Sequence, residues 1–154
     1  QTNLKFPEQK RVFSMIPGLA QAEFVRYGVM HRNTFLDSPR LLDQTFALRD
    51  DPLTVFAGQI TGVEGYMESA ASGLVAAEQL MRRLEGRPLL QLPPETMLGA
   101  LSRYISNEDV VDFQPMGANM GLLPPLSHRI KDKLQRYEAL SQRALEALQK
   151  ALER

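Results

Sequence analysis

Residues 53–80 read LTVFAGQITGVEGYMESAASGLVAAEQL, and this stretch decides the fold of the chain. Its first four residues, Leu53 to Phe56, are apolar and β-favouring, and they follow the turn signal Asp50-Asp51-Pro52, so they predict a buried strand. Gly58, Gly62 and Gly65 then end the strand, and helical spacing begins at Met67. The stretch therefore predicts a strand, a glycine-rich turn and a helix.

A helix that starts directly after such a turn leaves backbone N–H groups without helical partners, here from Glu64 to Met67. These groups can bind an anion or an electron-rich ring edge, and the helix dipole adds roughly 0.3 to 1 kcal/mol for a negative charge at that end. The glycine spacing fits two interpretations. One is a nucleotide or flavin site, and the other is a tight turn that only packs closely on a sheet.

Three segments carry a resemblance to a known family. FAGQITGVEGY (56–66) with ESAASG (68–73) resembles the second flavin-contacting segment of the folate-dependent tRNA uracil-5-methyltransferases, TrmFO. RYGVMHRNTF (26–35), with SP and LLD a few residues later, is similar to the family segment that precedes this motif. FQPM (113–116) with NMGLLPP (119–125) is similar to the late loop of the family, so the resemblance covers nearly the whole chain.

The resemblance implies an α/β fold, namely the C-terminal part of a doubly wound, Rossmann-like FAD-binding domain of the glutathione-reductase type with added helices. It implies a bacterial, cytoplasmic enzyme that uses methylenetetrahydrofolate, FAD and NAD(P)H to make 5-methyluridine in the T-loop of tRNA. It also implies ligand-binding positions. FAD would contact Gly58, Gln59, Ile60, Thr61, Gly62, Glu64, Gly65 and Tyr66, and folate would contact His31, Arg32 and Asn33.

The resemblance also implies that the family is longer than this chain. We expect an N-terminal portion with the dinucleotide-binding turn and the catalytic cysteines to be absent, because the chain begins at Gln1 and contains no cysteine. The remaining parts would be a folate-side segment (1–43), the strand–turn–helix flavin segment (44–86) and a helical region (87–154). We expect this fragment alone to be inactive, with no position that can be assigned a catalytic role.

Composition sets further bounds. The 154 residues are 44% hydrophobic, enough for one domain with a core, and no apolar run approaches the length of a membrane span, so we expect no membrane partner. Eighteen basic and eighteen acidic residues balance, so contact with RNA has to come from a local patch. Two histidines and no cysteine exclude thiolate metal sites and make a metal cage improbable, and we predict no metal site.

Further elements follow from residue spacing. Helices are predicted at 7–16, from Met67 to about Gly86, at 95–106 and at 127–154. Short strands are predicted at 24–27 and 46–49, with a turn at 37–39 and an extended linker at 89–94. The segment 113–125 is too rich in Gly, Pro and Asn for regular structure. It either packs as a rigid cover or borders the substrate pocket.

Two polar segments also allow two interpretations each. The run His31-Arg-Asn-Thr34 is either a solvated loop or the wall of a ligand site, with a ring that can stack beside a cation and two hydrogen-bonding side chains. The last helix is either simply solvated or binds RNA phosphates. From Arg129 onward it carries four acidic side chains and seven basic ones, Arg129, Lys131, Lys133, Arg136, Arg143, Lys150 and Arg154.

Two other functions remain open at this stage. The related wobble-uridine enzyme MnmG has a similar flavin segment, although MHRNTF (30–35) resembles the uracil-methylating family instead. The chain could also be a helical folding or docking module without activity, in which the glycine turn serves only packing.

Overall fold

The computed structural model describes residues 4–28 and 33–153, and the chain divides into two units between Asn33 and Thr34. In the first unit, helix α1 (Phe6–Phe13) is confirmed, and it ends three residues earlier than its spacing predicts. Its one buried side chain, Gln9, donates to the carbonyl of Leu4 at 2.6 Å and accepts from the N–H of Gly28 at 3.0 Å. Aromatic pairs join Phe6 to Tyr27, and Phe13 and Tyr27 to Phe24.

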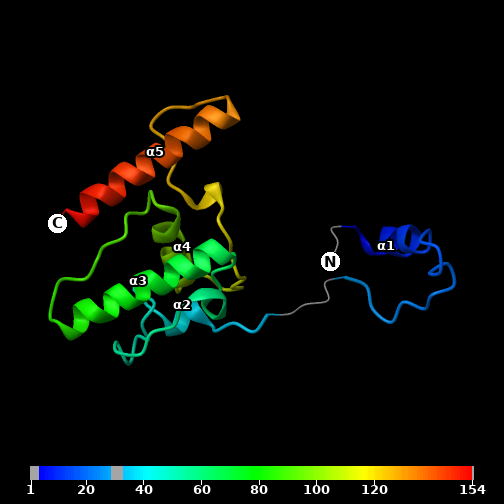
Figure 1. The fold of residues 1–154 in the computed structure, drawn as a ribbon, viewed down its shortest axis with the longest axis horizontal. Helices are drawn as coiled ribbons and strands as arrows, with labels where there is room; N and C mark the ends of the chain where they lie inside the picture. The colour runs from blue at the N-terminus through cyan, green and yellow to red at the C-terminus, as the bar shows by residue number, and fades with distance from the viewer. Residues whose placement is uncertain (1–3, 29–32, 154) are drawn as a thin grey trace. The chain divides into compact units, whose positions relative to one another are not determined.

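The second unit carries four α-helices and two short 3-10 turns among its described residues (Figure 1). The helices are α2 (Ser38–Leu41), α3 (Tyr66–Leu84), α4 (Met97–Ile105) and α5 (Lys133–Leu152), and the turns are η1 (Gly58–Thr61) and η2 (Met120–Leu122). α3 packs back on η1, and α4 packs on α2, α3 and η2. The core between them consists of Phe46, Val63, Ala76, Leu101, Ile105 and Phe113.

The predicted strands are wrong within the described residues, where only three isolated β-bridges form, Leu42 to Leu48, Ala47 to Val55 and Val63 to Met116. Phe46 has a φ of 66°, in the left-handed region, which interrupts the extended backbone expected over 46–49. Only Val55 of the predicted strand 53–56 forms a bridge. Residues 24–27 form none, and Val25 is almost fully exposed. These residues therefore show no doubly wound sheet, because isolated bridges cannot provide the neighbouring strands that a parallel sheet requires.

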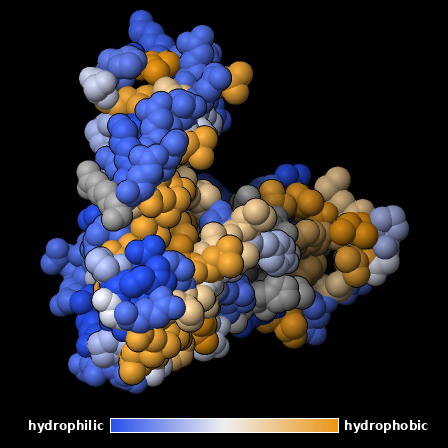
Figure 2. All heavy atoms as spheres, turned by 60° about the vertical axis from the view of Figure 1, so that its left-hand side comes forward, coloured by the Kyte–Doolittle hydropathy of each residue, from blue (hydrophilic) through white to orange (hydrophobic). Residues whose placement is uncertain are grey.

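The predicted helix after the glycine turn is confirmed as α3. Its buried face carries Ser72, Ala76 and Gln79. Apolar side chains also lie on its opposite face, where Met67 is 81% and Leu74 76% exposed. The orange atoms in Figure 2 show that apolar side chains reach the surface at several places. α3 is thus apolar on a wider arc than the core of the described residues covers.

The later elements agree with the sequence in kind. The helix predicted at 95–106 is α4, and the hydroxyl of Thr96 caps it by accepting from the N–H of Gly99 at 3.0 Å. The helix predicted at 127–154 is α5, which begins later, at Lys133, because Asp132 caps it by accepting from the N–H of Gln135 at 2.9 Å. The turn predicted at 37–39 is wrong for Ser38 and Pro39, which are the first two residues of α2, and Asp37 is the N-cap residue of that helix.

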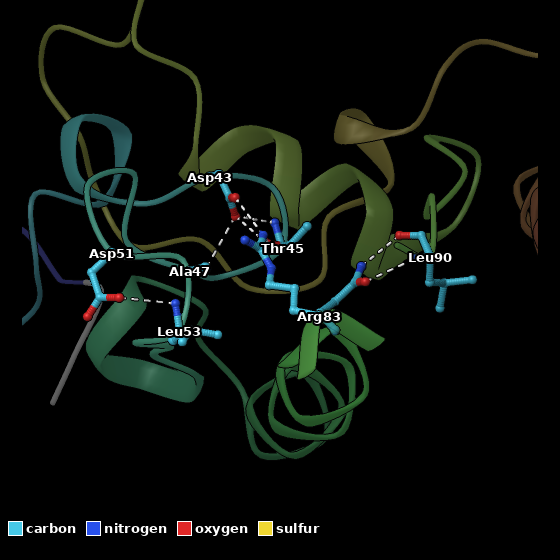
Figure 3. Close-up of polar contacts among 8 residues, drawn as sticks. Asp43, Thr45, Ala47, Asp51, Leu53, Arg83 and Leu90 are labelled. Atoms are coloured by element: carbon cyan, nitrogen blue, oxygen red, sulfur yellow. Dashed lines mark hydrogen bonds and ion pairs between the residues drawn. The ribbon is translucent and has the colours of Figure 1, made fainter. Parts of the chain in front are cut away.

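A polar network fixes the end of α3 to the segments beside it (Figure 3). The guanidinium of Arg83 donates to the carboxylate of Asp43 at 3.0 Å and to the hydroxyl of Thr45 at 2.5 Å. The other oxygen of Asp43 accepts from the N–H groups of Thr45 and Ala47. One turn earlier on α3, Gln79 pairs with both backbone groups of Leu90, at 2.6 and 2.9 Å. The predicted linker, 89–94, lies outside every helix and bridge, and Leu90 attaches it to α3.

Candidate functional site: the glycine turn and the adjoining groove

The glycine turn is the segment 58–65, which consists of η1 and the four residues that join it to α3. The first turns of α3 hold it through two serines. The hydroxyl of Ser72 accepts from the N–H of Gly58 at 2.8 Å, and the hydroxyl of Ser69 donates to the carbonyl of Val63 at 3.2 Å. Ser72 and Val63 are fully buried. The path of the turn is thus determined by the helix that follows it.

The first residues of the late loop (113–125) pack on the glycine turn. The N–H of Met116 donates to the carbonyl of Gly62 at 2.8 Å, and the N–H of Glu64 donates to the carbonyl of Met116 at 2.9 Å. Gly62 has a φ of 85°, and a Cβ at this position would lie 2.8 Å from Cε1 of the buried Phe113 ring. No larger residue fits both this backbone conformation and this ring contact. The interpretation of the loop as a packed cover is confirmed, because it closes one side of the turn.

The start of α3 remains open to solvent. Within the described parts of the chain, no group accepts a hydrogen bond from the N–H of Gly65, Tyr66, Met67 or Glu68, and no side chain caps the helix. Tyr66 is 98% exposed. The expectation of free N–H groups is confirmed for Tyr66 and Met67 and wrong for Glu64, whose N–H is bonded to Met116. The positive end of a 19-residue helix therefore faces an accessible surface.

A carboxylate lies beside this helix start, and sequence reasoning did not single it out. The side chain of Glu68 folds back toward Gly65, so that a Cβ on Gly65 would lie 2.7 Å from the Glu68 carboxyl carbon. One oxygen of Glu68 also accepts from the N–H of Ala118 in the late loop, at 3.2 Å. Acidic residues are common in the first turn of a helix, which was the available signal. With this negative charge next to it, the site suits a neutral hydrogen-bonding ring edge better than a phosphate.

The other positions predicted for FAD divide into inward and outward residues. Thr61 is fully buried and donates to the carbonyl of Gly58 at 2.7 Å, so its side chain supports the turn. The carbonyl of Ile60 accepts from the N–H of Leu36 at 2.8 Å. Gln59 and Glu64 are exposed. The structure thus brings the eight predicted positions together in one turn, although not all of them offer their side chains to the surface.

The predicted folate segment is described only in part. His31 and Arg32 lie outside the described residues. Asn33 is exposed and belongs to no helix or bridge.

A second feature, here called the basic groove, adjoins the late loop. It is an open groove of about 1320 Å³. Its lining comes from residues 116–121, residues 123–131 and the first turns of α5, with Arg136, Tyr137 and Leu140. The lining includes His128, Arg129 and Lys131 and no acidic side chain. The late loop therefore closes the glycine turn and also borders this groove. Its place beside a substrate pocket stays a prediction.

Residues 4–28 and 33–153 carry neither a metal-binding cluster nor a membrane-spanning helix. No group of three or more His, Asp and Glu side chains lies close enough together there to hold a metal ion. No helix in that part of the chain has the length and apolarity needed to cross a membrane.

Comparison with known proteins agrees with the resemblance seen in the sequence. The chain is 60% identical over 150 residues to a protein of Heliobacterium modesticaldum and 59% identical over 153 residues to one of Streptococcus agalactiae serotype III. A protein of Brevibacillus brevis is 56% identical over 149 residues. All three are named methylenetetrahydrofolate–tRNA-(uracil-5-)-methyltransferase TrmFO.

The matches cover 97 to 99% of this chain and 34% of the length of each relative. The chain thus spans about a third of the curated relatives it matches. The profile of the family described as glucose inhibited division protein A matches residues 1–88, which include the whole glycine turn and α3. By this match, the chain belongs to the glucose inhibited division protein A family.

Proposed function

We propose that the complete gene product is a folate- and FAD-dependent tRNA uracil-5-methyltransferase that makes 5-methyluridine in the T-loop. The observation that carries this proposal is the identity of 56 to 60% with relatives of that name over nearly all of this chain. The proposed reaction uses methylenetetrahydrofolate as the carbon source and NAD(P)H as the reductant. Its substrate would be tRNA, and we place the enzyme in the cytoplasm, where tRNA is modified.

We place part of the FAD site at the open start of α3. The residues that would hold the cofactor are the backbone groups from Gly58 to Tyr66, with the free N–H groups of Tyr66 and Met67 nearest to the surface. The carboxylate of Glu68 beside them disfavours a phosphate, so the flavin ring edge is the part of FAD that fits. Bound FAD would carry the reducing electrons from NAD(P)H to the one-carbon unit.

This chain would contribute positioning groups to the reaction. It contains no cysteine, so the cysteines that the TrmFO family uses on the uracil ring and the one-carbon unit would have to come from another part of the protein. We place folate at His31, Arg32 and Asn33, where the imidazole could cover one face of the pteridine and the two neighbours could bind polar groups of the folate. The doubly wound FAD domain likewise remains a proposal, which the family match supports.

Nucleoside mass spectrometry of tRNA from cells that lack the gene tests the proposed function. We expect 5-methyluridine to disappear from the T-loop and to return when the complete gene is restored. Wobble uridine serves as the internal comparison. Loss of a wobble-uridine modification, with T-loop methylation intact, would reject the proposal in favour of the MnmG-like reaction.

Two variants of the complete gene product separate the flavin site from the folate site. Gly65→Val forces a β-branched residue to a φ of 101° and against the Glu68 carboxylate, so we expect the protein to purify with several-fold less FAD. His31→Ala should keep FAD and its reduction by NAD(P)H while losing most folate-dependent methylation, because the methylene carbon is misplaced. Absorbance at the flavin band and methylation at subsaturating folate measure the two effects.

Full flavin occupancy in a folded Gly65→Val protein would place FAD elsewhere. Normal methylation by His31→Ala would show that His31 is a loop residue, and Tyr66 would then be the next candidate for the stacking platform.

A further inference from the structure

The basic groove gathers several cations that form no ion pair within the described residues. Arg129 and Lys131 lie on the non-helical segment before α5, and Arg136 is the fourth residue of that helix. Among residues 4–28 and 33–153, no carboxylate forms an ion pair with any of these three cations. All seven ion pairs in those ranges involve acidic residues between Glu8 and Glu108. The groove is thus a local excess of uncompensated positive charge in a chain whose formal net charge is zero.

The acidic residue nearest in sequence to Arg129 and Lys131 is Asp132, which caps α5. Asp132 lies between Lys131 and Lys133, and its carboxylate accepts from the N–H of Gln135 at 2.9 Å as the cap of α5. It therefore stabilises the start of α5, and it forms no ion pair with Arg129, Lys131 or Arg136 within the described residues. Fewer cations of α5 are available to a ligand than its sequence indicates. Arg143 donates to the carbonyls of Pro125 and Pro124 at 2.9 and 2.6 Å, and so it fixes the loop to the helix instead of facing a ligand.

An aromatic ring completes the groove. Tyr137 is half-buried in the lining, and the cationic groups of Lys133 and Arg136 lie 5.5 and 5.6 Å from its centroid. A ring held between two cations orders long side chains that would otherwise be mobile. Exposed cations beside an aromatic ring are the combination with which proteins bind phosphates and stack bases.

We infer that the basic groove binds the sugar–phosphate backbone of an RNA, with Arg129, Lys131 and Arg136 as phosphate contacts. The inference rests on the proposed function, because it takes the RNA to be the tRNA substrate. It assigns RNA contact to a defined surface, which adjoins the open start of α3 where the flavin is placed, because Ala118 of the groove lining is bonded to Glu68. Phosphates meet both requirements of the groove, since they supply the missing negative charge and they repeat along a chain that can follow an open channel.

The test compares two double variants of the complete gene product, each of which removes one arginine and one lysine. Arg129→Gln/Lys131→Gln changes the groove, and Arg103→Gln/Lys150→Gln changes two exposed positions outside the groove lining. None of the four side chains makes a hydrogen bond or an ion pair within the described parts of the chain, so both variants should fold and keep FAD. The probe is an unmodified tRNA transcript, titrated at several salt concentrations.

We expect the groove variant to bind the transcript roughly tenfold more weakly than the control variant near physiological salt. The plot of the logarithm of the association constant against the logarithm of the salt concentration has a negative slope. The magnitude of this slope should decrease by about 1.4 to 1.8, which corresponds to two lost phosphate contacts. Equal affinities and slopes for the two variants would overturn the inference. Loss of poly-L-glutamate binding in the groove variant, with transcript binding unchanged, would also overturn it and assign the groove to an acidic polypeptide.

The two proposals can fail independently. If the wild-type protein binds the transcript through the groove and leaves T-loop uridine unmethylated with folate, FAD and NAD(P)H present, the proposed function fails and the groove inference stands. If it methylates the transcript and the groove variant matches the control in affinity and salt slope, the groove inference fails and the proposed function stands.

Discussion

The glycine turn and the basic groove lie on either side of the late loop, and they are built in opposite ways. The turn is closed by backbone hydrogen bonds between Met116, Gly62 and Glu64 and by the buried ring of Phe113. The groove is open, and its cations have no carboxylate partners in the described residues. The first arrangement fixes a backbone path, whereas the second leaves charge available to a ligand. The late loop is therefore held by backbone hydrogen bonds on the side of the glycine turn, and on its other side it borders cations that are available to a ligand.

The largest effect should come from filling the turn. Gly62→Val places a β-branched residue at a φ of 85° and drives its Cβ into the Phe113 ring, so we expect a loss of about 3 kcal/mol or more in the free energy of unfolding. Urea unfolding of the complete gene product measures it. Gly73→Val is the matched control, because a Cβ at Gly73 meets no atom within 4 Å. Similar unfolding midpoints for the two variants would show that the turn is not tightly packed.

A smaller effect should distinguish the arginine that supports the structure of the groove, Arg143, from one that binds RNA in it, Arg136. Arg143→Gln removes two charged hydrogen bonds to the carbonyls of Pro124 and Pro125, which should cost about 1 to 2 kcal/mol of stability. Arg136→Gln removes only the contact with Tyr137 and should change stability by less than about 0.5 kcal/mol. Tm and affinity for the tRNA transcript should thus rank the two variants in opposite orders. The same order in both measurements would contradict the division of roles between these arginines.

The smallest effect should appear at acid pH, on the chain segment that leads into the glycine turn. Hydrogen bonds from the Thr54 hydroxyl and the Leu53 N–H lower the pKa of Asp51 below its ordinary value. A lowered pKa in the folded state means that the stabilisation is present above the ordinary pKa, near 4, and is lost as pH falls through the folded-state pKa. The Tm difference between wild type and Asp51→Asn should therefore shrink between about pH 5 and pH 3.

Asp50→Asn is the control for this titration, because Asp50 makes no hydrogen bond among the described residues. A difference between wild type and Asp51→Asn that stays constant over this pH range would show that the carboxylate of Asp51 does not order the turn at 51–54.

The sequence predicts those features that depend on neighbouring residues. Apolar spacing located α3 and α4, and the glycines located the turn between η1 and α3. Strand pairing depends on distant partners, so the apolar run at 53–56 could not reveal that only Val55 would form a bridge. The left-handed φ of Phe46 has no signal in its residue type.

The candidate site shows the same limit. Gly62 and Glu64 were predicted as flavin contacts from the family resemblance, whereas Met116, which is hydrogen-bonded to both, lies more than fifty positions later in the chain. Glu68 could be recognised as acidic, but its approach to Gly65 and Ala118 depends on where the late loop packs. The basic residues of α5 were visible, and only the structure separates Arg143, which binds two carbonyls, from the cations that line the groove.

The pairing of Gln79 with Leu90 has a consequence for which positions can vary through evolution. The amide of Gln79 reads only the backbone N–H and carbonyl of Leu90, so this contact places no demand on the side chain at position 90. Position 79 is restricted instead, because glutamate cannot donate at neutral pH and asparagine offers the same two groups on a shorter stem. The side chain at position 90 can therefore vary through evolution, while Gln79 keeps the backbone of the linker attached to α3.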